Sequence, residues 1–211
     1  MPQPSLPNIY IIGAQGTGKT TLVDALLPSL LPMCQTLNLQ PPATFPESAR
    51  QVLSTSTLTT SQIAASPTLS HSLNKAIIAA QSTAETLALS RSSWFISDRS
   101  AIDPIVYTRR SVSREAAADI MAGEDWVEMT GRMEGGLVVV CEAGMEWLVD
   151  DGLRLMPKGR EDWMSVYEGF CEVLGEVGVG YCVLPAGVES VEERVEFVIV
   201  KWRERVASLV V

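Results

Sequence analysis

The stretch GAQGTGKTTL, residues 13–22, carries residue types that hold phosphate groups in proteins. It matches the pattern G-x-x-x-x-G-K-[ST], in which the backbone N–H groups of a glycine-rich loop surround an anion. We expect Lys19 to contact the β- and γ-phosphates of a nucleoside triphosphate, and the Thr20 hydroxyl to ligate Mg²⁺. The predicted nucleotide-binding residues of this loop are Gly13, Ala14, Gln15, Gly16, Thr17, Gly18, Lys19, Thr20 and Thr21.

The stretch FISDRSAIDPIVY, residues 95–107, is the second candidate for chemistry. Asp98 and Arg99 follow an apolar run, and ligands of parallel sheets bind outside the carboxyl ends of the strands. Asp98 could hold Mg²⁺ or accept a proton, and Arg99 could neutralise a phosphoryl group during its transfer. The alternative is a helix N-cap aspartate beside a surface arginine.

The stretch PESARQVL, residues 46–53, follows another short apolar segment. Glu47 could orient or deprotonate a substrate hydroxyl, with Arg50 one helical turn away. The alternative is a short capped helix with exposed charges. We therefore predict four catalytic residues, which are Lys19, Glu47, Asp98 and Arg99.

The stretch DDGLRLMPKGRED, residues 150–162, is a basic loop within an acidic region. Arg154, Lys158 and Arg160 are suited to a lid that closes over phosphates and expels water, and solvated surface charges are the alternative. We predict nucleotide contacts for Arg154 and Arg160 and a lid over residues 150–162.

Short apolar runs alternate with helical patterns along the chain, which predicts an α/β fold with one parallel sheet. The first helix is expected to end or kink at Pro28. Residues 54–72 are rich in serine and threonine and predict an exposed, mobile insertion, and residues 123–136 predict an acidic connection. The expected strands are residues 9–12, 43–45, 94–97, 137–141 and 181–184, and the expected helices are residues 20–27, 69–89, 163–174 and 190–206.

Composition narrows the class of protein further. The 211 residues predict a single domain over residues 1–211, and the net charge of −9 argues against a nucleic-acid partner. The four cysteines form no CxxC pair, and no apolar run is long enough to span a membrane. With no basic and apolar leader at the N-terminus, we expect a reduced, soluble, cytoplasmic protein.

The four polar stretches, in this order, resemble the P-loop family described as an AAA domain of the NadR type, which includes nicotinamide-riboside kinases. They are more distantly similar to deoxynucleoside and thymidylate kinases. The resemblance extends over about residues 8–202 and implies a kinase-like fold, with a five-stranded parallel sheet and helices on both faces. It also implies that ATP–Mg²⁺ is held at Lys19, Thr20, Asp98 and Arg99, with an acceptor pocket within residues 50–110.

Two functions remain open at this stage. The first is a small-molecule kinase that transfers the γ-phosphoryl group of ATP to a nucleoside-like hydroxyl, oriented by Glu47 or Asp98. The second is a binding or regulatory module that uses ATP or GTP with slow or no hydrolysis. The resemblance extends to eukaryotic proteins described as GTP- and phosphoinositide-binding, and Arg109, Arg110 and Arg114 could contact a lipid headgroup or lie on a solvated helix face.

Overall fold

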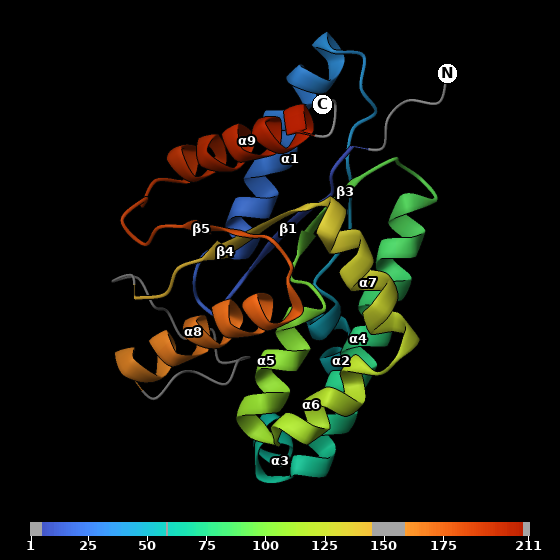
Figure 1. The fold of residues 1–211 in the computed structure, drawn as a ribbon, viewed down its shortest axis with the longest axis vertical. Coiled ribbons are helices and arrows are strands. Elements are labelled where there is room, and N and C mark those ends of the chain that lie inside the picture. The colour runs from blue at the N-terminus through green and yellow to red at the C-terminus, as the bar shows by residue number, and fades with distance from the viewer. Residues whose placement is uncertain (1–5, 58, 145–158, 209–211) are drawn as a thin grey trace.

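The protein is described by a computed structural model that covers residues 6–57, 59–144 and 159–208 (Figure 1). Strands and helices alternate through most of this range. The strands are β1 (Ile9–Gly13), β2 (Ala43–Thr44), β3 (Phe95–Asp98), β4 (Leu137–Cys141) and β5 (Cys182–Leu184). The helices are α1 (Lys19–Thr36), α2 (Ser48–Thr55), α3 (Thr60–Ala65), α4 (Pro67–Leu89), α5 (Ile102–Ser111), α6 (Arg114–Met121), α7 (Glu124–Gly135), α8 (Arg160–Val177) and α9 (Val191–Ser208).

The five strands form one sheet in the order β2-β3-β1-β4-β5, and every neighbouring pair is parallel. The predicted α/β fold with a five-stranded parallel sheet is confirmed. The five predicted strands are present with ends that differ by at most one residue; β3, for example, ends at Asp98 rather than at residue 97. Asp98 therefore stands at the carboxyl end of a central strand.

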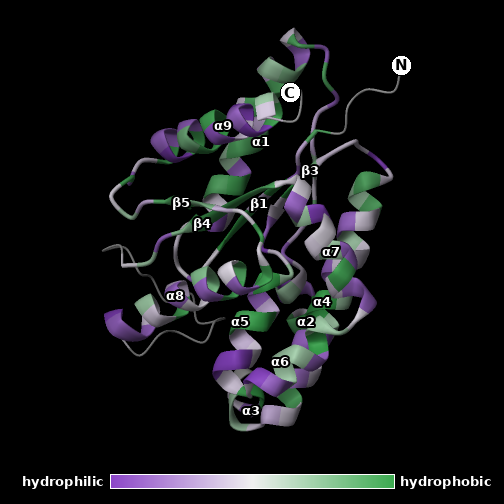
Figure 2. Cartoon of the chain, viewed as in Figure 1, coloured by the Kyte–Doolittle hydropathy of each residue, from purple (hydrophilic) through white to green (hydrophobic). Residues whose placement is uncertain are grey.

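Helices cover both faces of the sheet, as Figure 1 shows. Ile9 and Ile11 pack on one face with α1 and α9, whereas Tyr10 and Ile12 pack on the other with α5, α7 and α8. This alternation follows from the strand geometry, which points successive side chains to opposite faces. Figure 2 shows the apolar strands at the centre of the molecule. Because both faces are covered, β1 is apolar at every position before its glycine.

Helix α1 was expected to end or kink at Pro28; it does not end there, but runs through Pro28 and Pro32 to Thr36. Its buried residues Leu22, Leu26, Leu30 and Cys34 continue one face at helical spacing. Two prolines remove backbone hydrogen bonds at a cost of roughly 3 kcal/mol each. Burial of this face beneath the sheet offsets that cost, so tertiary packing decides the length of the helix.

Two polar segments form helices, which their composition did not predict. Described residues of the segment 54–72 form α3 and the start of α4, which carry side-chain caps at Thr59 and Ser66. Residues 123–136 form α7, with Trp126, Met129 and Met133 buried at helical spacing. Serine and threonine suit helix N-caps as well as loops, which is why composition alone misled.

A buried carboxyl group lies between α4, α7 and β1. Glu85 is fully buried, and Tyr10 Oη donates to its Oε2 over 3.4 Å. Gln81 Nε2 donates to its Oε1 over 3.2 Å, and Arg132 approaches Oε2 to 3.2 Å. Burial raises the pKa of Glu85 to about 7, although Gln81 and Arg132 oppose this shift.

The raised pKa of Glu85 predicts that the free energy of unfolding falls as the pH rises. The folded protein holds a proton on Glu85 up to a pKa of about 7, whereas the unfolded chain releases it near 4.5. This difference contributes about 3 kcal/mol to the free energy of unfolding. The contribution is fully present below the pKa of Glu85 in the unfolded chain and is lost as the pH rises through its pKa in the folded protein. We expect urea unfolding at about pH 5 and pH 8 to show this fall, and Glu85→Gln to reduce it.

Glu128 provides the matched control, because it pairs with the same Arg132 but is exposed. Glu128→Gln should leave the fall in unfolding free energy unchanged. An identical pH dependence in the wild type and in Glu85→Gln would contradict the assignment.

Candidate functional site

The phosphate loop connects β1 to α1, and two of its glycines are required by their surroundings. Gly13 has φ of 130°, and a Cβ atom there would lie 2.6 Å from the carbonyl oxygen of Cys141 on β4. Gly18 has φ of 74° at the N-cap of α1. A side chain at either position would strain the backbone or displace the neighbouring strand. The loop can therefore approach the sheet closely while leaving its other side open.

Lys19 folds back into this loop. Its Nζ donates to the carbonyl oxygen of Ala14 over 2.5 Å and lies 3.4 Å from Thr17 Oγ1. The pKa of Lys19 is lowered to about 8, mainly by burial and secondly by the positive charge of Arg99. A buried ammonium group that is held by neutral oxygens favours an added anion, because phosphate would restore the stability of its charge.

Thr20 and Asp98, which are 78 positions apart in the chain, meet at the edge of the sheet. Thr20 Oγ1 donates to Asp98 Oδ2 over 2.5 Å. Asp98 Oδ1 is buried and has no hydrogen-bond partner among the described residues. A threonine hydroxyl beside an unsatisfied carboxylate oxygen is a donor set that fits Mg²⁺, which prefers oxygen ligands and retains several waters. The sequence predicted that these two residues share a metal, and the structure places them together.

Arg99 lies at the centre of an ion-pair cluster. Its Nε donates to Glu47 Oε1 from the N-cap of α2, and its Nη1 donates to Asp103 Oδ1 on α5 over 3.0 Å. Burial alone would lower the pKa of Arg99, but the carboxylates of Asp103 and Glu47 hold it well above its usual value. The arginine is therefore charged and held in place by its neighbours.

The backbone of Arg99 is also constrained. Its φ is 88°, a value that residues other than glycine seldom adopt, and its N–H donates to the carbonyl oxygen of Ile11 over 2.9 Å. Ser97 Oγ donates to its carbonyl oxygen over 2.8 Å. Unusual backbone geometry of this kind is concentrated at functional sites.

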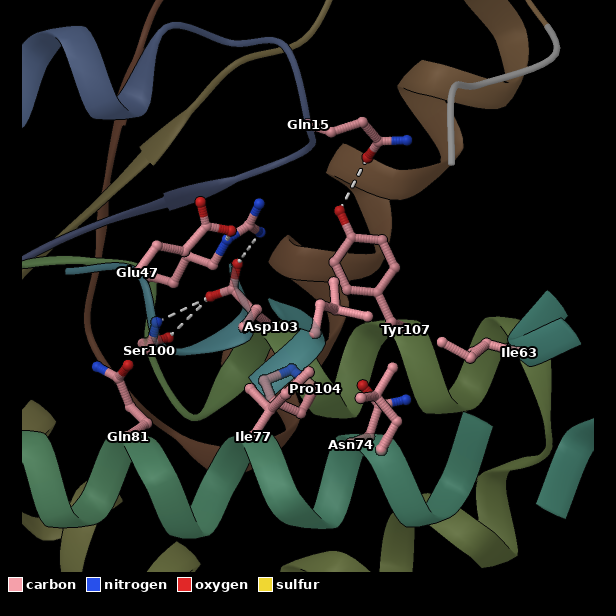
Figure 3. A pocket seen from close by; sticks show the side chains of 14 residues that line it. Gln15, Glu47, Ile63, Asn74, Ile77, Gln81, Ser100, Asp103, Pro104 and Tyr107 are labelled. Carbon is pink, nitrogen blue, oxygen red and sulfur yellow. Dashed lines mark hydrogen bonds and ion pairs between the residues drawn. The ribbon is translucent and has the colours of Figure 1, made fainter. Parts of the chain in front are cut away.

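A cavity of about 170 Å³ opens beside this cluster (Figure 3). Its wall joins Gln15 of the phosphate loop to Tyr107 of α5, because Tyr107 Oη donates to Gln15 Oε1 over 2.8 Å. Most of its lining residues fall within the expected range 50–110, although Gln15, Glu47 and Ala49 lie outside it. The lining residues are Gln15, Glu47, Ala49, Leu53, Ile63, Leu73, Asn74, Ile77, Gln81, Arg99, Ser100, Asp103, Pro104 and Tyr107.

Sequence reasoning missed several residues of the site. Asp103 follows Arg99 by one helical turn, and this spacing was the available signal. Arg194 of α9 is buried and donates through Nη2 to the carbonyl oxygen of Thr17 over 2.8 Å. Its Nη1 would lie 3.2 Å from a Cβ atom at Gly18, so it supports the phosphate loop from outside. Nothing in the local sequence connects Arg194 with a loop 176 residues earlier.

The predicted lid lies mostly outside the described residues, and this includes Arg154 and Lys158. Arg160 is the first residue of α8 and is exposed. The structure therefore brings Glu47, Asp98 and Arg99 together with the phosphate loop, but shows no such contact for Arg160.

The arginine cluster on α5 and α6 is neither a free basic patch nor a simply solvated face. Arg109 and Arg114 pair with Glu176 of α8, and Arg110 pairs with Asp162 of the same helix. These ion pairs tie α5 and α6 to α8. Their charge is matched locally, which weakens the case for a lipid headgroup at this surface.

Neither a membrane-spanning helix nor a cluster of metal ligands is present in the described ranges. No helix within residues 6–57, 59–144 and 159–208 is long and apolar enough to cross a bilayer. The same part of the chain holds no cluster of three or more His, Cys, Asp or Glu residues able to bind a metal ion.

Comparison with solved structures shows the fold. A NadR protein in complex with NR matches with a TM-score of 0.71 and 20% identity, covering 95% of this chain and 52% of the other. NadR with NAD and AMP-PNP matches with a TM-score of 0.65 and 18% identity, at 95% and 49% coverage. The chain thus spans about half the length of these NadR chains. Deoxyadenosine kinase from M. mycoides with bound dATP matches with a TM-score of 0.56 and 13% identity, at 93% and 99% coverage.

Comparison with curated protein sequences finds no match. A family model described as an AAA domain matches residues 8–194, which includes the phosphate loop, the Arg99 cluster and the start of α9. This chain therefore belongs to the AAA domain family, and its fold is similar to that of the NadR structures.

Proposed function

We propose that this protein is an ATP-dependent small-molecule kinase that transfers the γ-phosphoryl group of ATP to a hydroxyl group of a nucleoside-like acceptor. The observation that carries the proposal is the junction of the phosphate loop and the cavity. Gln15 belongs to both, and the charged cluster of Glu47, Arg99 and Asp103 lines the same cavity. When the site for ATP and the site for the acceptor adjoin beside charged residues that are held in place, the acceptor hydroxyl can lie in line with the phosphoryl group to be transferred.

On the donor side, Lys19 would contact the phosphates of ATP, and the loop amides would surround them. Thr20 and Asp98 would hold Mg²⁺, and the bound ion would neutralise charge on the phosphate oxygens. GTP in place of ATP is compatible with the same phosphate contacts. We place this reaction in the cytoplasm, since all four cysteines are free thiols.

On the acceptor side, the substrate hydroxyl oxygen forms a bond to the γ-phosphorus while the bond to the β–γ bridging oxygen breaks. ADP leaves with that electron pair, and the hydroxyl proton passes to the carboxylate of Glu47 or Asp98. Arg99 neutralises the charge on the transferring group. The apolar walls of the cavity exclude water, which would otherwise compete with the hydroxyl as the nucleophile.

The relatives support an acceptor of this class. NadR was solved with NR, and deoxyadenosine kinase carries a nucleoside in its name. Both proteins share the fold of this chain, and the cavity described above lies beside the phosphate loop.

Replacing the loop lysine tests nucleotide binding. Lys19→Ala should weaken ATP–Mg²⁺ binding by at least about 100-fold, because the charge that meets the phosphates is lost. The fold should remain, since burial already disfavours the charged form of Lys19. Calorimetric titration with ATP measures the affinity, and circular dichroism checks the fold. Unchanged affinity would contradict the proposal.

The pKa of Lys19 predicts a pH dependence of binding. Lysine must be protonated to attract phosphate, and its pKa in the free protein is about 8. ATP affinity should therefore fall as the pH rises above that value, towards about tenfold for each further pH unit. Titration in buffers of different ionisation enthalpy should show proton uptake on binding near pH 8. Lys75→Met, at an exposed lysine, should keep the same profile, and a constant affinity up to about pH 9.5 would count against the assignment.

The transfer reaction itself is tested with ATP–Mg²⁺ and a panel of nucleosides that includes nicotinamide riboside. We expect ADP release that depends on the nucleoside and is absent in Lys19→Ala. Arg99→Met should lower kcat by about 100-fold with little change in ATP affinity, because its charge acts on the transferring group. Arg50→Met is the matched control, since Arg50 also pairs with Glu47 but is half-exposed.

If ADP release never exceeds that of Lys19→Ala with any nucleoside, the kinase proposal is wrong. The alternative of a binding or regulatory module that uses ATP or GTP, with a protein or phosphoinositide partner, would then replace it.

A further inference from the structure

Two carbonyl oxygens of the phosphate loop are held from outside the loop by buried side chains. Trp163 of α8 donates through Nε1 to the carbonyl oxygen of Gln15 over 2.7 Å. Arg194 of α9 donates through Nη2 to the carbonyl oxygen of Thr17 over 2.8 Å. Trp163 is 2% exposed and Arg194 is 3% exposed. Hydrogen bonds buried to this degree fix the direction of the accepting carbonyl groups, because breaking them would leave polar groups unpaired.

The direction of each carbonyl group sets the direction of the next N–H group in the loop. In a trans peptide unit the C=O and N–H bonds point in opposite directions. The peptide unit with the Gln15 oxygen carries the N–H of Gly16, and the unit with the Thr17 oxygen carries the N–H of Gly18. The first N–H group is therefore turned away from α8, and the second is turned away from α9.

The two donors approach the loop from opposite faces of the sheet. Trp163 packs in the same cluster as Tyr10, whereas α9 packs with Ile11 on the other face. Figure 1 shows α8 and α9 on either side of the strands. Because each N–H group points away from its own helix, the two groups converge on the space between the helices.

This convergence has the geometry of an anion site. Gly16 has φ of 75° and Gly18 has φ of 74°, and left-handed residues of this kind turn successive N–H groups towards one concave side. The described part of the chain records no hydrogen bond donated by either N–H group. Both groups are therefore available to the oxygens of a phosphate.

We propose that Trp163 and Arg194 are positioning residues for the nucleotide, which hold the N–H groups of Gly16 and Gly18 in the direction that receives its phosphates. The inference rests on the proposed function, of which it requires only nucleotide binding. A loop that is already aligned does not have to reorganise when the anion binds, so more of the strength of its hydrogen bonds appears as affinity. Without these donors the peptide units can rotate, and part of the affinity is lost.

Trp163→Phe tests the first donor. It removes the N–H group and keeps an aromatic ring in the core. We expect the affinity for AMP-PNP–Mg²⁺, measured by calorimetric titration, to fall about fivefold, since one buried hydrogen bond no longer holds the peptide unit. An affinity equal to that of the wild type would overturn the inference.

Trp202 provides the matched control. It is also 2% exposed, and its Nε1 donates to the carbonyl oxygen of Pro7 over 2.8 Å in the core on the other face of the sheet. Trp202→Phe should lower the free energy of unfolding in urea as Trp163→Phe does, but should leave the AMP-PNP affinity unchanged. An equal loss of affinity in both variants would assign the effect to a loosened core and would overturn the inference.

Arg194 carries a charge as well as donors, and two substitutions separate these contributions. Glutamine and methionine are uncharged and similar in length, but only glutamine can donate to the Thr17 oxygen. Arg194→Met should weaken AMP-PNP binding about tenfold, and Arg194→Gln should bind about threefold more tightly than Arg194→Met. Equal affinity in these two variants would assign the effect to charge and would overturn the positioning role of Arg194. If the variants of one residue do not fold by circular dichroism, those of the other carry the test.

The two levels of the proposal fail differently. If the wild type does not bind AMP-PNP–Mg²⁺, the proposed nucleotide site is wrong and the inference falls with it. If the wild type binds AMP-PNP–Mg²⁺ and the variants of Trp163 and Arg194 bind it equally well, the nucleotide site stands and the positioning role is wrong.

Discussion

The charge of one buried guanidinium group organises this site. Arg99 is 9% exposed, and it is stable there because carboxylates from α2 and α5 surround it. Removing either carboxylate would leave an uncompensated buried charge, which is costly in a protein interior. The ion pairs therefore fix where α2 and α5 begin relative to the end of β3. The walls of the cavity and the approach to the phosphate loop follow from those positions.

The sheet supplies the second constraint. β1 and β3 are adjacent and parallel, so the loop after β1 and the residues after β3 emerge at the same edge. This is why Thr20 and Asp98 touch although β2 and α2 to α4 lie between α1 and β3 in the chain. Charged and polar groups are thus gathered at one edge of the sheet, while helices cover both faces. The binding groups therefore lie at the carboxyl ends of the strands, and the apolar core lies on the two faces of the sheet.

Behind the cavity, a chain of polar side chains connects the site to the interior. Gln81 links Glu85 to Ser97, and Ser97 holds the strained backbone of Arg99. Each member uses its donors and acceptors in one sense only, so the orientation of one group restricts the next. The carboxyl group of Glu85, whose pKa is raised, lies within a mostly apolar layer. Its hydrogen bond with Gln81 restricts the orientation of an amide that lines the cavity.

The sequence by itself determined the parallel α/β fold, the phosphate loop, and the positions of Asp98 and Arg99 after a strand. These are local signals, because glycine spacing and apolar runs reflect the backbone at the same residues. Only the tertiary structure decided that α1 continues past Pro28, that Gln81 faces the cavity, and that Arg194 supports the loop. Each of these depends on burial against segments distant in the chain. Local pattern carries no information about which distant group will satisfy a buried side chain, and packing alone selects it.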